Sequence, residues 1–367
     1  MGEWKECLLG EVLNLKRGYD LPNQDRLPGR IPIISSSGTM HFHSESKACG
    51  PGVVTGRYGT IGEVFYTEGD YWPLNTTLYV QDFKGNHPKY IYYLLKGFDF
   101  GKYSDKSAVP GVNRNDLHTE SVIIPDIPEQ KAIAEVLSSL DDKIDLLHRQ
   151  NKTLESLGQT LFRQWFIEET DDSWDEINLS DIADHFKDSV NPSKEPAKIF
   201  NHYSLPAFDE GMEPKPEIGA SILSNKYKVL ENTILISKLN PRTPRVWPIF
   251  GTVNEDSSIC STEFQVVKPK NLAHYGFIYY FLKSYQVTHE LSGASGGTSG
   301  SHQRVNPDDI FNLGLLLPTD NKIIDFNKVC SEHLSKIRIN KSQIGRLSAL
   351  RDLLLPKLMS GDVIVQS

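Results

Sequence analysis

The sequence predicts an α+β protein in which two similar β-rich α/β domains are joined and spaced by two long antiparallel coiled-coil helices. Three observations favour this class. Most of the chain is an internal repeat, each copy contains short β-type runs, and each copy ends in a long stretch with an apolar seam of helical spacing. At 367 residues the chain is long enough for two or three domains.

The two copies are related by an offset that changes along the chain. Residues 91–96 (IYYLLK) return 187 positions later as 278–283 (IYYFLK), and Val112-Asn113 returns 193 positions later as Val305-Asn306. From there to the end of each copy the offset stays constant. A constant offset is typical of a long helix, because one inserted residue would rotate the apolar face by about 100°.

Each copy starts with a globular part. Short β-type runs broken by Gly, Pro, Ser and Asn predict strands at 31–34, 52–55, 62–66, 78–80, 233–236 and 264–267. One aromatic helix is expected in each part, at 90–96 and 275–283, with its rings in the core. The resulting domains are 1–125, a spacer helix at 126–168, 169–318, a second spacer helix at 319–360, and a tail at 361–367.

The two spacer helices have recognisable starts and seams. Asp126 can cap the first helix, Pro128 suits the first turn, and Glu129 can complete a capping box. Eight of ten seam positions between 133 and 165 are apolar, whereas Asn340 and Arg351 interrupt the second seam. Two such helices with a domain between them predict an antiparallel pair. The alternative is two unrelated amphipathic helices on separate cores.

Charge and composition limit the function. The net charge of −8 argues against a chain that holds DNA alone on a large basic face. The four cysteines form no CxxC pair, which is typical of reduced thiols in a cytoplasmic protein. No apolar run approaches the roughly 18 residues that a membrane helix needs, and the first residues do not resemble a signal peptide.

Motifs for catalysis by this chain alone are missing. The sequence contains no GxGxxG and no GxxxxGK[ST], and no Asn-Pro step continues as the Pro-Pro-aromatic segment of amino-methyltransferases. Pro125-Asp126 followed by Glu129-Gln130-Lys131 superficially resembles a metal nuclease motif, but both acids would share one helical turn, so we interpret it as a cap. His41-x-His43 lacks further ligand types nearby and is interpreted as a surface pair.

Two loops recur at matching places in both halves and carry side chains that can read bases. They lie at 56–62 and 106–114 in the first half, and at 237–245 and 292–304 in the second. A glycine turn with an arginine is a common surface loop, and it is the recurrence that favours DNA binding. The candidate DNA contacts are Arg57, Tyr58, Gly59, Asn113, Arg114, Lys238, Asn240, Arg242, Arg245, Thr298, Ser299, Gln303 and Arg304, with Lys16-Arg17 and Ser35-Ser36-Ser37 as weaker candidates.

Together these segments resemble the specificity (S) subunit of type I restriction–modification systems. The resemblance covers essentially the whole chain. The segments that show it are VVTGRYGTIG at 53–62, PxxPEQ at 125–130, LxxLDxKI at 137–144, LFxxWF at 161–166 and LLPKLxSG at 354–361. ISKLNPRTPRVW at 236–247 and PTDNKI at 318–323 depart from the pattern, which leaves the recognised DNA sequence open.

The resemblance implies a non-catalytic subunit with two target recognition domains, each reading one half of a split, asymmetric double-stranded DNA site. The paired helices would set the gap between the half-sites and dock two methyltransferase subunits, and two restriction–translocase subunits would join them. S-adenosylmethionine, ATP and Mg²⁺ would belong to those partners, so no cofactor or metal is expected in this chain. The acidic balance is compatible with partners that supply most phosphate contacts.

Other classes of function stay open at this point. The chain could be a methyltransferase or nuclease acting alone, which turnover by the purified chain would reveal. It could be a coiled-coil scaffold that does not bind DNA, in which case Arg57→Ala and Arg304→Ala would leave DNA affinity unchanged. It could also be a partnerless or anti-restriction protein that is similar to a specificity subunit.

Overall fold

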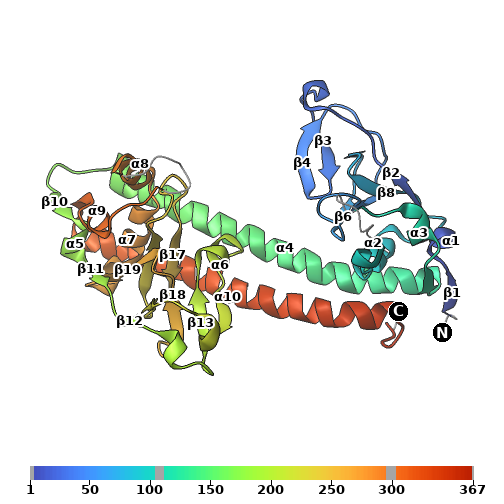
Figure 1. Ribbon diagram of the computed structural model, residues 1–367. Coiled ribbons are helices and arrows are strands. Elements are labelled where there is room, and N and C mark those ends of the chain that lie inside the picture. The colour runs from blue at the N-terminus through green and yellow to red at the C-terminus, as the bar shows by residue number, and fades with distance from the viewer. Residues whose placement is uncertain (1–3, 104–110, 295–302, 366–367) are drawn as a thin grey trace. The chain divides into compact units, whose positions relative to one another are not determined.

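The structure is a computed structural model that describes residues 4–103, 111–294 and 303–365 (Figure 1). The chain forms two compact units. Unit 1 contains residues 1–146 and 343–367, and unit 2 contains residues 147–342. Each unit therefore combines one globular region with a part of each long helix.

Unit 1 is built on a four-stranded antiparallel sheet of order β2-β8-β5-β6. A smaller sheet of order β4-β3-β7 and a two-stranded sheet of β1 and β9 complete it. Its elements before the first long helix are β1 (Lys5–Leu8), α1 (Leu9–Val12), β2 (Asn14–Arg17), η1 (Asn23–Asp25), β3 (Ile31–Ser35), β4 (Gly38–His43), β5 (Gly52–Gly56), β6 (Val64–Thr67), β7 (Trp72–Pro73), β8 (Thr77–Asp82), α2 (Pro88–Lys96), η2 (Phe100–Tyr103), α3 (Arg114–His118) and β9 (Ser121–Ile124).

Unit 2 has a four-stranded antiparallel sheet of order β11-β19-β16-β17, a five-stranded sheet of order β12-β15-β18-β13-β14, and the pair β10 and β20. Its elements between the long helices are β10 (Asp175–Asn178), α5 (Leu179–Ile182), β11 (Ala183–Phe186), β12 (Ser189–Val190), η4 (Pro192–Lys194), β13 (Ile199–Tyr203), α6 (Leu205–Asp209), β14 (Lys215–Ile218), η5 (Gly219–Ser221), β15 (Lys226–Lys228), β16 (Thr233–Ser237), β17 (Val246–Ile249), β18 (Ser258–Cys260), β19 (Phe264–Pro269), η6 (Leu272–His274), α7 (Tyr275–Leu282), α8 (Tyr285–Ala294), α9 (Pro307–Phe311) and β20 (Gly314–Leu317).

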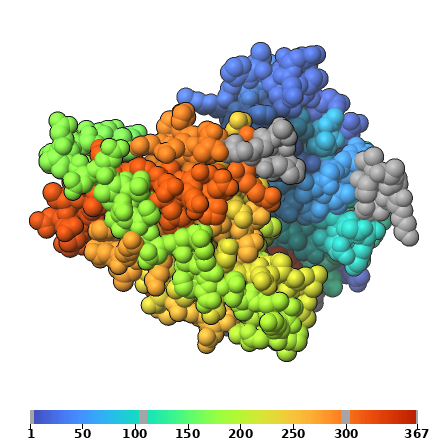
Figure 2. Space-filling model, turned by 60° about the vertical axis from the view of Figure 1, so that its left-hand side comes forward, coloured from blue at the N-terminus to red at the C-terminus, as the bar shows by residue number. Residues whose placement is uncertain are grey.

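The sequence repeat is a repeat of structure. The four-stranded sheets have equivalent strand orders, and β10 pairs with β20 as β1 pairs with β9. Strands β10 and β20 are paired although they lie far apart in the sequence. Figure 2 accordingly shows green and orange-red residues next to each other on the surface of unit 2. The small sheet of unit 1 and the five-stranded sheet of unit 2 differ, which agrees with the changing offset of the globular parts.

The long helices are α4 (Ile127–Arg163), which a π-helical turn at Gln164–Glu168 extends, and α10 (Asp320–Met359). The predicted cap is confirmed, since the Glu129 backbone N–H donates to Asp126 Oδ1 at 3.1 Å. The adjacent Gln130 is buried, and its side chain bonds Asn86 Oδ1 at 2.8 Å and the backbone N–H of His87 at 3.0 Å. The PEQ segment therefore anchors the helix start to the start of α2.

Within each unit the two helices run antiparallel. In unit 1, Arg351 of α10 bonds Asp141 of α4 at 2.9 Å, and Leu358 shares a core with Leu137. In unit 2, Asn340 donates to Asn151 Oδ1 at 2.8 Å, and the rings of Phe326 and Phe162 lie 6.0 Å apart. The two interruptions of the second seam thus have polar partners on α4.

The sequence-based domain limits treat each helix as a segment of its own, whereas the structure divides both helices between the units. The reason is that each apolar seam completes two cores. Leu358 and Leu137 belong to the core of unit 1, while Phe326 and Phe162 belong to that of unit 2. The aromatic side chains of α2 and α7 lie mostly in these cores, as expected.

Candidate nucleic-acid interface

The first candidate loop is a tight turn after β5. The backbone N–H groups of Arg57 and Tyr58 both donate to the carbonyl oxygen of Thr76, at 2.8 and 3.1 Å. Gly59 has φ of +79°, a conformation that side chains rarely allow. The turn holds the Arg57 guanidinium over the Tyr58 ring at 4.5 Å.

The second candidate loop lies directly beside the first. The backbone N–H of Val112 donates to the carbonyl oxygen of Arg57 at 3.0 Å, and Tyr58 forms a β-bridge with Gly111. A Cβ atom at Gly111 would lie 2.2 Å from the Tyr58 ring, so glycine is required for this approach. Residues 106–110 of this loop lie outside the described residues.

Asn113 and Arg114 follow at the start of α3. Asn113 is the N-cap, and its side-chain oxygen accepts the backbone N–H of Asn115 at 3.0 Å. The N-cap bond explains an asparagine at position 113 without any contact to DNA. Arg114 is exposed, and within the described ranges it has no acidic partner.

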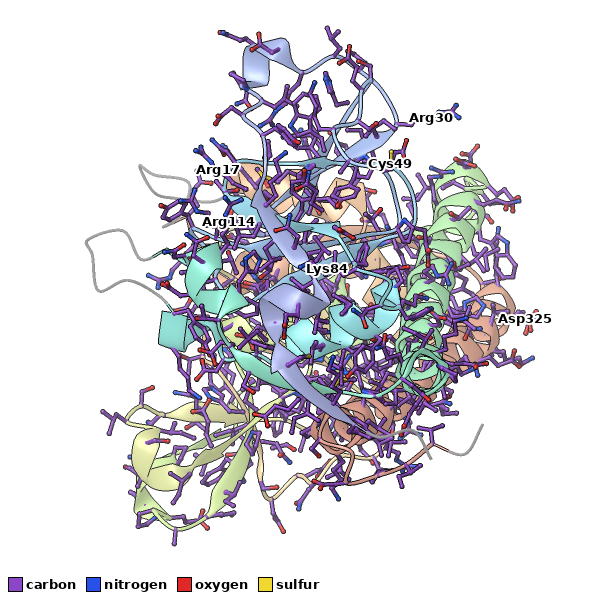
Figure 3. All side chains as sticks on the ribbon, turned by 90° about the vertical axis from the view of Figure 1, so that its right-hand side faces the viewer. Arg17, Arg30, Cys49, Lys84, Arg114 and Asp325 are labelled. Atoms are coloured by element: carbon purple, nitrogen blue, oxygen red, sulfur yellow. The ribbon has the colours of Figure 1, made fainter. Side chains whose placement is uncertain are left out.

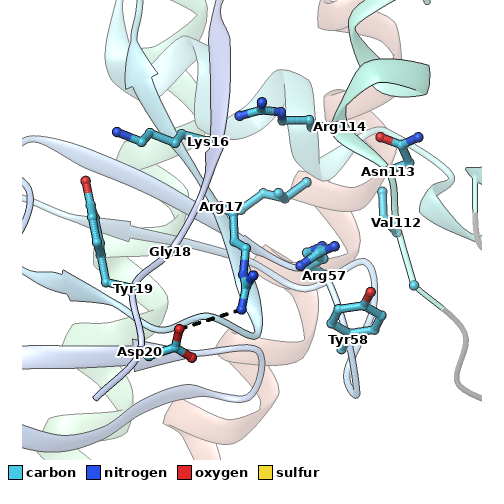
Figure 4. Close-up of a pocket in the computed structure, with 12 residues that line it drawn as sticks. Lys16, Arg17, Gly18, Tyr19, Asp20, Arg57, Tyr58, Val112, Asn113 and Arg114 are labelled. Atoms are coloured by element: carbon cyan, nitrogen blue, oxygen red, sulfur yellow. Dashed lines mark ion pairs between the residues drawn. The ribbon is translucent and has the colours of Figure 1, made fainter.

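These side chains line a pocket of about 680 Å³ (Figure 4). Lys16 and Arg17, at the end of β2, complete it, and Arg17 and Arg114 lie on the same side of unit 1 (Figure 3). Among the described residues, the cationic side chains of Lys16, Arg17, Arg57 and Arg114 line it together with one carboxylate, that of Asp20, which is 3.8 Å from Arg17. The pocket is therefore positively charged and suited to a polyanion.

His118 holds α3 against the start of β2. Its Nε2 atom accepts the backbone N–H of Leu15 at 2.9 Å, so the ring is neutral at this nitrogen. Burial, and then the charges of Arg114 and Lys84, lower the pKa of His118. Sequence analysis did not single out His118, because its partner lies 103 positions away.

Unit 2 joins its two candidate loops in the same way. The backbone N–H of Val305 donates to the carbonyl oxygen of Lys238 at 2.9 Å, and Leu239 forms a β-bridge with Arg304. Asn240, with φ of +53°, donates its backbone N–H to the carbonyl oxygen of Gln303 at 2.9 Å. The equivalence of the loops, inferred from the repeat, is thus matched by equivalent backbone bonds.

Several known proteins that are similar to this chain are described as specificity subunits of type I restriction enzymes. Residues 1–156 match the family described as type I restriction modification DNA specificity domain. The chain is 28% identical over 335 residues to the type I restriction enzyme MjaIX specificity subunit of Methanocaldococcus jannaschii, covering 80% of this chain and 74% of that protein. It is 26% identical over 201 residues to the HindI specificity subunit of Haemophilus influenzae, covering 46% and 42%.

The fold has a solved counterpart. The crystal structure of the type I restriction–modification S subunit from M. genitalium aligns with a TM-score of 0.68 at 16% identity, covering 98% of this chain and 96% of that one. The chain is similar in sequence and in fold to the specificity subunits of type I restriction–modification systems. The matched specificity domain contains the entire positively charged pocket of unit 1.

Two predicted DNA contacts of unit 2, Arg245 and Arg304, are bonded to acidic side chains. Arg245 bonds Asp209 through Nε at 2.7 Å and Nη2 at 2.9 Å, and its side chain is only 16% exposed. This pair raises the pKa of Arg245 and lowers that of Asp209. Arg245 therefore ties the start of β17 to the end of α6, and little of its side chain is exposed for contact with DNA.

The remaining candidates of unit 2 differ in exposure. Lys238 is half-buried and Arg242 is exposed, and neither has an acidic partner within the described part of the chain. Arg304 is exposed and bonds Glu263, through Nε at 3.3 Å and Nη2 at 3.1 Å. Thr298 and Ser299 lie outside the described residues.

One sequence-based interpretation in unit 1 is wrong. His43 is not part of a surface pair with His41, because it is buried, its ring lies 5.2 Å from that of Trp72, and its Nδ1 accepts the backbone N–H of Leu27 at 3.0 Å. Among the described residues, no three His, Cys, Asp or Glu side chains gather as metal ligands would. No helix in the described ranges has the length and hydropathy to cross a membrane.

Proposed function

We propose that this chain is the DNA sequence-specificity subunit of a type I restriction–modification complex and that it reads a bipartite, asymmetric site. The observation that carries the proposal is the equivalent joining of two polar loops in both units, through Val112 and Arg57 in one and Val305 and Lys238 in the other. The loop side chains differ between the units, so two recognition sites of one design would read two different half-sites.

The positively charged pocket of unit 1 supports DNA as the ligand. Lys16 and Arg17 suit phosphate oxygens. Arg57, on the first loop, and Arg114, directly after the second loop, line the same pocket. The whole chain is acidic, with a net charge of −8. Most phosphate contacts would therefore come from basic partner subunits, with base recognition left to this chain.

The two long helices would dock two methyltransferase subunits. Leu146 and Leu157 of α4 are 39% and 47% exposed, and Ile339 and Leu350, 193 positions later, are 56% and 43% exposed. In each helix the two residues are 11 positions apart, about three turns, and share a face. Exposed apolar side chains that recur at the offset of the repeat suit two copies of one partner.

Chemistry would reside in those partners. S-adenosylmethionine would belong to the methyltransferase subunits, while ATP and Mg²⁺ would belong to two restriction–translocase subunits. The role of this chain is then to place one adenine of each half-site at a methyltransferase active site, where the base is flipped out of the duplex. The chain itself would be non-catalytic.

The decisive experiment is methylation sequencing of DNA exposed to this chain co-expressed with its neighbouring methyltransferase subunit. We expect a split motif with N6-methyladenine in both halves. A stable complex that modifies no DNA, or modifies it without sequence preference, would contradict the proposal and favour a scaffold.

Variants of the pocket test its assignment. Arg57→Ala should relax one base position at a cost of about 1–3 kcal/mol in binding, whereas Lys16→Ala should weaken all sequences alike and lower the salt slope by about 1. Lys131→Ala, which removes an exposed cation outside the pocket, is the control and should change neither. If Arg57→Ala and Lys16→Ala both behave like this control, the pocket is not the DNA site.

A further inference from the structure

The two units differ in chemistry at two equivalent positions of the candidate interface. The carbonyl oxygen of Thr76 accepts the backbone N–H of Arg57, and that of Glu263, 187 positions later, accepts the backbone N–H of Lys238 at 2.9 Å. Gly111, next to Val112, corresponds to Arg304, next to Val305. A threonine and a glycine in unit 1 thus become a glutamate and an arginine in unit 2.

In unit 2 the exchanged residues bond each other. Arg304 donates from Nε to Glu263 Oε2 at 3.3 Å and from Nη2 to Oε1 at 3.1 Å. The Arg304 side chain is 57% exposed, whereas that of Glu263 is 25% exposed. The pair therefore holds an accessible guanidinium in one orientation at the junction of the two loops.

The ion pair is not needed to join the loops. Unit 1 makes the same backbone connection with the Tyr58 ring on Gly111 and no ion pair at that place. An ion pair with an exposed partner also contributes little to stability. Its position at the interface, rather than stability, accounts for the pair.

Within the described part of the chain, the bonding pattern leaves one edge of the Arg304 guanidinium without a partner. Arginine has five N–H groups, and Glu263 engages the Nε group and one on Nη2. The two N–H groups of Nη1 and the second one of Nη2 remain. They form the fork that matches O6 and N7 of guanine in the major groove. An arginine already held in place also loses less side-chain entropy when it binds.

We propose that Arg304 reads a guanine in the half-site of unit 2 and that Glu263 is the residue that positions it. This inference rests on the proposed function. A second part of the inference concerns unit 1, which has Thr76 and Gly111 at the positions of Glu263 and Arg304. Unit 1 would therefore prefer a different base. Glu263 was not among the residues that the sequence singled out, because only the fold brings it to Arg304.

The test is binding selection from randomised DNA duplexes by the chain in complex with its methyltransferase subunit. Arg304→Ala should lower the preference for guanine at one position of one half-site by about 5- to 100-fold and leave the other half-site unchanged. Glu263→Ala should lower the same preference by about 5-fold. Glu263→Gln should restore part of it, because its amide oxygen still accepts one N–H.

Arg163→Ala is a matched control, because it removes an exposed arginine whose Nε lies 3.1 Å from Glu168 in the same unit. It should leave the base preference unchanged. An unchanged motif with Arg304→Ala, or an equal loss for all sequences, would overturn the inference while a split wild-type motif still supports the proposed function. A wild-type complex without any motif would overturn both.

Discussion

At the scale of single residues, the candidate interface is decided by which charged groups have partners. In unit 1, Arg114 and Lys16 line a pocket in which Asp20 is the one acidic residue within the described part of the chain. In unit 2, Arg245 and Arg304 are each bonded to an acid. The two candidate sites therefore present different electrostatic surfaces although their backbones are joined alike.

His118 provides a prediction for pH. Its folded-state pKa is lowered from 6.5, so the unfolded chain binds a proton at a higher pH than the folded one. The stability due to the bond with Leu15 is fully present above pH 6.5 and is lost as pH falls from there through the lower, folded-state pKa. We expect the melting temperature of unit 1 to fall more between pH 7.5 and 5.5 in the wild type than in His118→Asn.

The variant His118→Asn should also cost about 1–3 kcal/mol at pH 7.5, because the buried N–H of Leu15 loses its acceptor. Thermal unfolding at the two pH values measures both effects. His148→Asn, at an exposed position of α4, is the control. Equal pH sensitivity of the wild type and His118→Asn would show that this bond does not govern the acid response.

At the scale of elements, the long helices contain one glycine and a pair of asparagines that an apolar seam would not require. Gly158 lies on α4 where the hydroxyl of Tyr280 approaches. A Cβ atom there would be 2.0 Å from that oxygen. Asn151 and Asn340 form the polar layer of the helix pair in unit 2.

Gly158→Ala should destabilise unit 2 by about 1–3 kcal/mol, because Tyr280 is buried and can move little. Gly345→Ala is the matched control on α10, where a Cβ atom has no neighbour within 4 Å. Higher helix propensity should make that variant more stable by up to about 1 kcal/mol. Urea unfolding measures both, and a stabilising Gly158→Ala would refute the packing argument.

The asparagine layer predicts non-additive substitutions. Asn340→Leu should cost about 1–3 kcal/mol, because it leaves the Asn151 carboxamide without its partner. Asn151→Leu with Asn340→Leu should be nearly neutral or stabilising, since both polar groups are then removed. A double-mutant cycle of unfolding free energies tests this, and additive losses would mean that the two residues do not interact.

At the scale of the whole molecule, the repeat gives the two long helices equivalent exposed residues. If two copies of a methyltransferase subunit dock there, Leu350→Glu should remove the copy bound at one of the equivalent places and Leu157→Glu the copy at the other. The double variant should then bind none. Native mass spectrometry of the chain mixed with its methyltransferase subunit counts the copies.

Leu353→Glu is the control for this experiment. Leu353 is also exposed on α10, but its counterpart 193 positions earlier is Thr160, so the position is not apolar in both copies. This variant should still bind two subunits. Two bound copies in every variant would mean that the repeated leucines are not the docking positions.

Spacing and periodicity in the sequence predicted the repeat, the strands β5, β6, β8, β16 and β19 of the two main sheets, the paired helices with the Asp126 cap, and the loops that carry Arg57 and Lys238, but not β2, β11 and β17. These features follow from local rules, because periodicity, caps and glycine turns depend on residues close together in the chain. Asn340 and Arg351 were recognised as interruptions of a seam for the same reason.

Which charged side chains are bonded to a partner depends on contacts that the fold alone creates. Asp209 and Arg245 are 36 positions apart, Glu263 and Arg304 are 41 apart, and Leu15 and His118 are 103 apart. No spacing rule connects such pairs, since they meet through the packing of separate strands and loops. The similarity of the two units could therefore be predicted from the sequence. The ion pairs and hydrogen bonds that distinguish them depend on long-range contacts and could not.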